Sequence, residues 1–113
     1  MSTISTHVLD TARGRPAAGV RVRLEAAGAD GWDSVGATIT DDDGRASDLI
    51  GGDVRVEPGV YRLIFDTGTW FAERGVPSFH PHVTVAFEVA DSDDHYHVPL
   101  LLSPFGYSTY RGS

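Results

Sequence analysis

Three histidines, His7, His95 and His97, are the side chains of this sequence best suited to acid–base chemistry. Imidazole is the one side chain whose unperturbed pKa places its change of charge near neutral pH. His95 and His97 are separated by one residue, so both point to the same face if this segment is a β-strand. A histidine that activates a water molecule is therefore the simplest catalytic chemistry that the sequence offers.

Other catalytic chemistries lack the residues that they need. The sequence contains no cysteine, which excludes thiolate metal sites and disulfides. All nine basic residues are arginine, which excludes a Schiff base on lysine. There is no Gly-x-Ser-x-Gly motif for a nucleophilic serine and no glycine-rich loop for a phosphate group. We accordingly expect that the protein uses no cofactor.

A metal site is an alternative use of the histidines. His80-Pro81-His82 and His95-Tyr96-His97 both place two imidazoles two residues apart, which suits ligands on a strand. The acidic run Asp41–Gly44 lacks the alternating ligands and the terminal glutamate of a calcium loop, so it predicts a solvated turn, as does the run 91–94. We expect no metal, and a metal-binding sandwich remains a competing hypothesis.

The elements that position these histidines are predicted to be short strands. Thirteen glycines and six prolines divide the chain into short segments. Within several of them apolar and polar residues alternate with the period of a half-buried strand. Strands are expected at Thr3–Leu9, Val20–Glu25, Trp32–Thr40, Gly59–Asp66, His82–Val89, His95–Leu102 and Gly106–Arg111.

A single helix is expected from Thr67 to Arg74. Thr67 or Thr69 is suited to cap its first turn, and Gly75 is suited to end it. Two helical turns cannot build a helical fold, whereas seven or eight short strands at this spacing are typical of an antiparallel sandwich. The sequence therefore predicts an all-β protein with one short helix.

Composition and charge limit the class of protein. A chain of 113 residues fits one domain, which we assign to residues 1–113. The formal net charge of −7 argues against a nucleic-acid partner. No apolar run approaches the roughly 20 residues that span a bilayer, and the first residues lack a secretory signal. We expect a cytoplasmic protein that does not enter a membrane.

The segment Val98–Leu102 predicts an oligomer. Its odd-numbered and even-numbered positions are both apolar, so both faces of the strand would be apolar. A sandwich strand normally has one apolar face and one face in water. The chain has no further helix to cover the outer face of this strand. We therefore expect a second subunit to cover it in a symmetric oligomer.

Five separated motifs make the chain resemble the transthyretin-related family from end to end. They are Thr6–Asp10, Asp43–Arg45, Phe79–His82, His95–Leu102 and the closing Tyr110–Ser113. The closing Tyr-Arg-Gly-Ser is similar to the branch of the family that hydrolyses 5-hydroxyisourate, and not to the hormone carriers. The resemblance implies a transthyretin-like (prealbumin-like) eight-stranded antiparallel sandwich with one short helix.

The same resemblance implies a homotetramer with sites in a central channel. The implied reaction hydrolyses 5-hydroxyisourate to 2-oxo-4-hydroxy-4-carboxy-5-ureidoimidazoline during urate degradation, without a cofactor. The alternative is a transthyretin-like carrier that binds a small ligand without turnover.

The residues that the resemblance implies for the site come from both ends of the chain. The catalytic residues are His7, Arg45 and His97, and a general base is expected at one of the two histidines. Which histidine is the base, and whether His95 enters the site, is left open by the sequence. The hormone-binding relatives carry other residue types at the three catalytic positions, which favours catalysis over carriage. The implied substrate-binding residues are His7, Arg45, Tyr110, Arg111 and Ser113.

Overall fold

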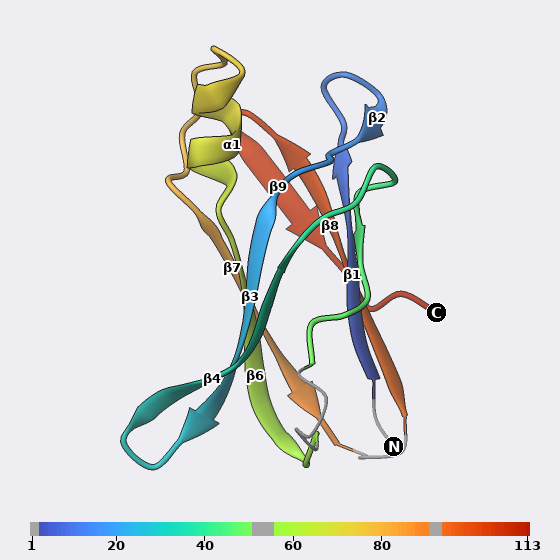
Figure 1. The fold of residues 1–113 in the computed structure, drawn as a ribbon, viewed down its shortest axis with the longest axis vertical. Coiled ribbons are helices and arrows are strands. Elements are labelled where there is room, and N and C mark those ends of the chain that lie inside the picture. The colour runs from blue at the N-terminus through green and yellow to red at the C-terminus, as the bar shows by residue number, and fades with distance from the viewer. Residues whose placement is uncertain (1–2, 51–55, 91–93) are drawn as a thin grey trace.

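Two β-sheets pack face to face, and a short helix covers one end of the sandwich (Figure 1). The structure is a computed structural model and describes residues 3–50, 56–90 and 94–113. The predicted turn at 91–94 lies outside the described residues except for Asp94. The elements are β1 (Thr3–Asp10), β2 (Arg15–Pro16), β3 (Arg21–Gly28), β4 (Gly31–Ile39), β5 (Arg45–Ala46), β6 (Gly59–Phe65), α1 (Thr67–Glu73), β7 (Val83–Val89), β8 (His95–Ser103) and β9 (Gly106–Thr109).

The strands form one five-stranded and one four-stranded sheet. The five-stranded sheet has the order β2-β1-β8-β9, and β5 also pairs with β1, whereas the four-stranded sheet has the order β4-β3-β6-β7. The predicted all-β sandwich with one short helix is confirmed. Two of the nine described strands, β2 and β5, are only two residues long.

The pairing of β1 with β8 differs from the antiparallel arrangement that the sequence predicts. The two strands run parallel, with Thr3 opposite His95 and Asp10 opposite Leu102, while the other described strand pairs are antiparallel. An antiparallel direction is imposed where a hairpin joins two strands. The whole four-stranded sheet lies between β1 and β8 in the sequence, so no hairpin fixes their relative direction.

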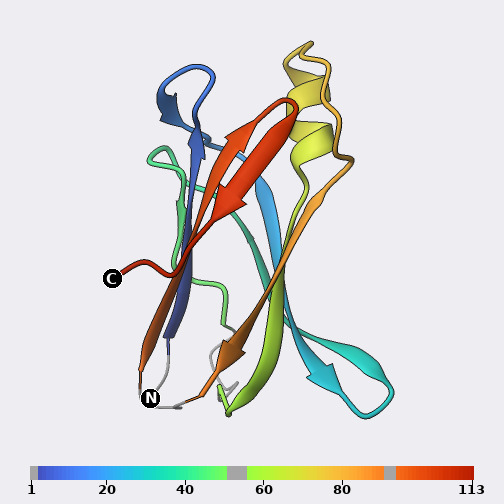
Figure 2. The same cartoon turned by 180° about the vertical axis from the view of Figure 1, so that it is seen from behind.

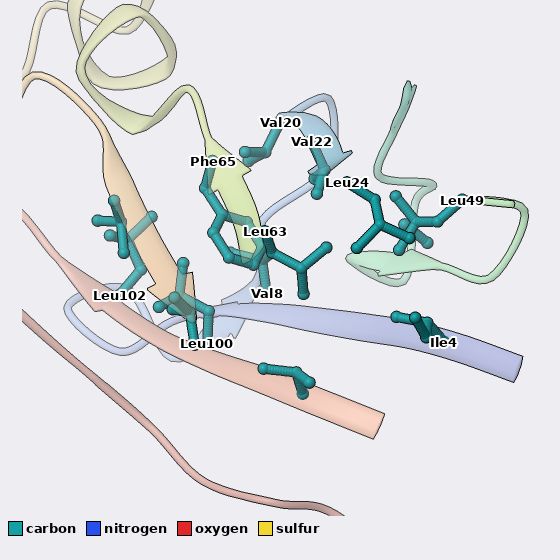
Figure 3. Close-up of a cluster of buried hydrophobic side chains, with 14 of the residues drawn as sticks. Ile4, Val8, Val20, Val22, Leu24, Leu49, Leu63, Phe65, Leu100 and Leu102 are labelled. Atoms are coloured by element: carbon teal, nitrogen blue, oxygen red, sulfur yellow. The ribbon is translucent and has the colours of Figure 1, made fainter. Parts of the chain in front are cut away.

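Alternation along the strands separates the core from the outer faces. On β1, Ile4, Thr6, Val8 and Asp10 are buried between the sheets, and the residues between them are half-buried or exposed on the outer face. Figure 3 shows how apolar side chains from both sheets meet in the core. Those labelled there are Ile4, Val8, Val20, Val22, Leu24, Leu49, Leu63, Phe65, Leu100 and Leu102.

The helix forms where it is predicted, but its cap differs. Asp66 is the N-cap residue and makes no side-chain capping hydrogen bond, so the prediction of Thr67 or Thr69 as the cap was wrong. Thr67 is instead the first helical residue, and it is buried together with Trp70 and Phe71. Gly75 ends the helix at φ +68°, as predicted. No helix within the described ranges is long and apolar enough to cross a membrane.

Candidate active site on the outer face of the five-stranded sheet

The strand registers bring three of the predicted site residues to one face. Antiparallel pairing of β1 with β5 places His7 opposite Arg45, and parallel pairing of β1 with β8 places Ser5 opposite His97. Residues opposite one another on paired strands share a face of the sheet. Because the residues that alternate with them on β1 are buried in the core, this shared face is the outer one. His7, Arg45 and His97 therefore lie together although three different strands carry them.

A shallow cavity of about 260 Å³ opens on this face. Its volume lies near the lower end of the range for sites that bind small molecules. Arg45, His97 and Ser113 all border it, so the cavity joins the centre of the sheet to the end of the C-terminal segment. The full lining consists of Ser5, Thr6, Asp41, Arg45, Ala46, Ser47, His95, His97 and Ser113.

Hydroxyl groups connect the two histidines of β8 in a hydrogen-bonded chain. Ser5 Oγ lies 2.8 Å from His97 Nδ1 and 3.3 Å from His95 Nε2, and Thr3 Oγ1 contacts His95 Nδ1. The two imidazole rings stack with centroids 6.3 Å apart. Each hydroxyl can donate one hydrogen bond and accept two, so Ser5 Oγ can bridge the two rings when both imidazoles are neutral. His95 thus belongs to the cluster, which the sequence had left open.

Ser5 is a site residue that sequence reasoning missed. Ser5 lies two residues before His7 on β1, so both side chains point to the same face of the strand. This spacing is visible in the sequence. The contact with His97 depends on the parallel register between β1 and β8, which no local pattern encodes.

The pKa of His97 is lowered from the ordinary histidine value of 6.5. Burial of the ring is the main cause, because it disfavours the charged form. The positive charges of His95, His7 and Arg45 lower the pKa further. His97 is therefore neutral at pH 7 and has a lone pair that can accept a proton.

A tight turn holds Arg45 beside His7. The Asp41 carboxylate accepts hydrogen bonds from the backbone N–H groups of Asp43 and Arg45, both at 2.9 Å. Gly44 has φ +76°, and a Cβ atom there would lie 2.4 Å from the carbonyl oxygen of Val8. The predicted solvated turn is confirmed, and the Asp41 side chain is used to build it. Among the described residues the guanidinium group of Arg45 has no ion pair.

A hydrogen bond from the same turn orients the ring of His7. His7 Nε2 lies 2.8 Å from the carbonyl oxygen of Asp43, which can only accept a hydrogen bond. Nε2 therefore carries the proton, and Nδ1 holds the lone pair when the ring is neutral.

The C-terminal segment crosses onto the outer face and contacts His97. The Gly112 N–H donates a 2.8 Å hydrogen bond to the His97 carbonyl oxygen. Figures 1 and 2 both show the chain leaving β9 and ending on the side of β1 that faces away from the four-stranded sheet. A Cβ atom on Gly112 would lie 2.5 Å from His97 Cδ2, so only glycine allows the segment to pass this close to the ring.

Tyr110 and Arg111 do not border the same cavity as Arg45 and Ser113. They line a neighbouring cavity of about 330 Å³ between β7 and the β8–β9 edge, which shares His97 with the first. The Arg111 guanidinium pairs with Asp94 at 3.0 Å and lies 4.7 Å from the centre of the Tyr96 ring. The His95 backbone N–H and then Arg111 hold the pKa of Asp94 below its ordinary value.

The described residues offer no clear metal centre. Across residues 3–50, 56–90 and 94–113, no group of three or more His, Cys, Asp or Glu side chains is arranged to hold a metal ion. His80 packs edge-on against Phe79 and Tyr107, with ring centroids 4.9 and 5.1 Å away.

The fold and the site together define a β-sandwich of two unequal sheets with a histidine–arginine cluster on the outer face of the larger sheet. A family model described as the HIUase/transthyretin family matches residues 4–112. The chain belongs to this family.

Individual relatives include 5-hydroxyisourate hydrolases and a transthyretin. A 5-hydroxyisourate hydrolase of Pseudomonas aeruginosa is 44% identical, over 100% of this chain and 93% of its own length. The solved structure of Klebsiella pneumoniae 5-hydroxyisourate hydrolase matches with a TM-score of 0.87 and 38% identity, covering 100% of both chains. Sea bream transthyretin, solved with thyroxine, matches with a TM-score of 0.89 and 33% identity, over 96% of this chain and 93% of that one.

Proposed function

We propose that this protein hydrolyses 5-hydroxyisourate to 2-oxo-4-hydroxy-4-carboxy-5-ureidoimidazoline. The observation that carries the proposal is the cluster of His7, Arg45 and His97 on one face of the sheet. In this cluster the neutral His97 is a base, and the nearby Arg45 is a cation without an ion pair among the described residues. Hydrolysis of an amide requires both a base and a cation. Relatives that bear the name 5-hydroxyisourate hydrolase match the whole chain and support the same reaction.

In this mechanism His97 is the general base. Its lowered pKa keeps the ring neutral, and we assign the proton of the neutral ring to Nδ1, which donates a hydrogen bond to Ser5 Oγ, so that Nε2 is free to accept a proton. A water molecule loses a proton to Nε2 as its oxygen attacks the carbonyl carbon of a ring amide. The C–N bond of the tetrahedral adduct then breaks, and the leaving nitrogen takes the proton back from His97. The carboxylic acid formed loses its remaining proton to solvent and becomes the carboxylate product.

Arg45 has the role of the electrostatic partner. Its guanidinium group has no competing ion pair in the described part of the chain, so it can donate to the oxygen on which negative charge develops. His7, held by the Asp43 carbonyl, lies on the same face but outside the residues that line the cavity, and we assign it the role of orienting the substrate or the water. Ser113 adds a hydroxyl group at the border of the cavity.

The direct test is an assay with freshly made substrate. Urate oxidase converts urate to 5-hydroxyisourate in the cuvette, and the ultraviolet decay of that compound is followed with and without the protein. The proposal requires a faster decay that is proportional to protein concentration. An unchanged decay at micromolar protein would reject it.

The alternative is a carrier that binds a small ligand in the same place, since sea bream transthyretin with its thyroxine has the same fold. A carrier binds an aromatic ligand without accelerating the decay of 5-hydroxyisourate. The lining at Arg45 and His97 favours the hydrolase, because a neutral imidazole beside a guanidinium group supplies the base and the cation that hydrolysis of an amide needs.

A homotetramer is part of the proposal. The outer face that carries the site also exposes parts of Leu9 and Leu101, which are neighbours across β1 and β8. β7 and β9 are edge strands of the two sheets and line one cavity, so both edges are open to a second subunit on the same side. A subunit on that side would also bring Tyr110 and Arg111 to a shared site. Part of the cover predicted for β8 comes from the chain itself, since Gly112 lies against Pro99.

Light scattering is expected to give a molar mass near four times the 12.1 kDa of one chain. The physical reason is that half-buried leucines and two open strand edges leave apolar surface that association removes from water. A monomer at assay concentrations that keeps full turnover would contradict the tetramer while leaving the reaction in place.

The rate is expected to fall as the pH is lowered. The base must be neutral, and the pKa of His97 lies below 6.5, so kcat/KM stays on its plateau at pH 7 and falls only once the pH drops through the lowered pKa. The midpoint of the decline is therefore expected below pH 6.5. A rate that does not change between about pH 5 and 8 would contradict a histidine base whose pKa lies within that range.

Replacing Ser5 with alanine is expected to lower kcat about 3- to 10-fold with little change in KM, the scale of one ordinary hydrogen bond. The change removes the hydroxyl that lies 2.8 Å from His97 Nδ1 and that accepts the hydrogen bond of Nδ1–H in the proposed mechanism. Ser5→Thr keeps a hydroxyl and should restore most of the rate. Equal losses of kcat in both variants would show that Ser5 acts through packing.

A further inference from the structure

The outer face of the four-stranded sheet carries a second basic cluster, remote from the site described above. A groove of about 730 Å³ runs over this face. Arg21 and Arg23 project into it from β3, because Val22 and Leu24, which alternate with them, are fully buried in the core. Arg62 of β6 borders the same groove. Three of the nine arginines of a chain with net charge −7 therefore meet in one place.

Two of these arginines lack the partners that the third one has. Arg62 pairs with Glu25 at 2.6 Å and lies over the Trp32 ring at 4.1 Å. Arg23 reaches the same carboxylate only at 4.0 Å. Arg21 has no ion pair among the described residues. Arg21 and Arg23 thus place two positive charges two residues apart on one face. Among the described residues no ion pair with a second carboxylate offsets the repulsion between them.

The positions where carboxylates would compensate these charges are apolar. Arg21 lies opposite Ile39, and Arg23 lies between Ala37 of β4 and Ile64 of β6. Ile39 is 51% exposed, which is unusual for a large aliphatic side chain in a sheet. Asp66 is the one acidic residue in the described lining, where it stands against three arginines and His82. The groove thus combines an apolar floor with an excess of positive charge.

We propose that this groove binds a small organic anion with a flat apolar body and a carboxylate, sulfonate or phosphate group. The guanidinium forks of Arg21 and Arg23 match the geometry of such a group, and the ion pair they form with it removes their mutual repulsion. The apolar body covers Ile39 and Ala37.

This site does not depend on the hydrolytic reaction. The groove lies on the opposite sheet from Arg45 and His97, and it shares no lining residue with their cavity. Loss of anion binding in the groove should therefore leave hydrolysis intact, and loss of hydrolysis should leave anion binding intact. The two proposals can thus be tested separately.

The test is a fluorescence titration with 1-anilinonaphthalene-8-sulfonate, an aromatic anion that becomes bright in an apolar site. An Arg45→Gln background removes the cation of the candidate active site as a second place for the probe. Adding Arg21→Gln and Arg23→Gln together should weaken binding at least tenfold. Ile39→Ser, which removes the floor but no charge, should also weaken it.

The matched control is Arg13→Gln with Arg15→Gln, two exposed arginines outside the groove that give the same change in net charge. This control should bind the probe as the background does, and turnover of 5-hydroxyisourate by the Arg21/Arg23 variant, made without Arg45→Gln, should equal that of the unaltered protein. Unchanged affinity after loss of Arg21 and Arg23 would overturn the proposal. An equal loss in the control pair would also overturn it, because it would show general charge attraction only.

Discussion

Replacing His97 with alanine is expected to lower the turnover of 5-hydroxyisourate by about 10²–10⁴, the usual scale for loss of a general base. The substitution removes the ring whose pKa is lowered by burial and by its charged neighbours. It also leaves Ser5 without its 2.8 Å partner. The effect should appear in kcat, because the base acts on water in the transition state and contributes little to substrate binding.

His80→Ala is the matched control for this substitution. His80 is half-buried, as His97 is, and packs against Phe79 and Tyr107 away from the cavity. It should retain nearly full turnover. Full turnover in His97→Ala would remove that histidine from the mechanism and leave His7 as the candidate base.

Deleting residues Tyr110 to Ser113 is expected to reduce hydrolysis by at least about 10²-fold, since a shift of about 1 Å in a catalytic group has an effect of this size. The deletion removes Ser113 from the border of the cavity and the Gly112 hydrogen bond to the His97 carbonyl. The sandwich should remain folded, because none of these four residues belongs to the buried core. Circular dichroism and thermal unfolding measure the fold, and the decay of 5-hydroxyisourate measures turnover.

Two full-length variants separate the parts of this segment. Gly112→Ala would place a Cβ atom 2.5 Å from His97 Cδ2, so it should displace the ring and reproduce much of the loss. Arg111→Gln removes the ion pair with Asp94 and the contact with the Tyr96 ring but leaves Gly112 and Ser113 in place, so it measures the part of the loss that belongs to Arg111 as a proposed substrate-binding residue. A truncated protein with normal turnover would contradict any role of this segment in the reaction.

The sequence predicted the strands well where alternation is strict. In β7 the buried Val83, Val85 and Val89 share one parity, and in β8 the pair His95 and His97 shares the outer face. The helix at Thr67–Glu73 and its end at Gly75 followed from local signals as well. Such features depend on neighbours within a few residues, so a single sequence carries them.

Features that depend on long-range register were not available from the sequence. The parallel direction of β1 and β8, and with it the contact between Ser5 and His97, comes from how two distant strands pack. The separation of Tyr110 from Ser113 into two cavities arises because the chain crosses the His97 backbone at Gly112. Neither has a local signature in residue type or spacing.

The parallel pairing of β1 with β8 also orders events on the ribosome. Thr3 and His95 are 92 residues apart, so β1 emerges long before its partner has been synthesised. The hairpin of β3 and β4 can form early. The five-stranded sheet can form only after β8 has been synthesised, and its formation has the entropy cost of closing a long loop. Until then the apolar face of β1 is open to misassociation in the nascent chain. The cluster around His97 is consequently among the last parts of the protein to be assembled.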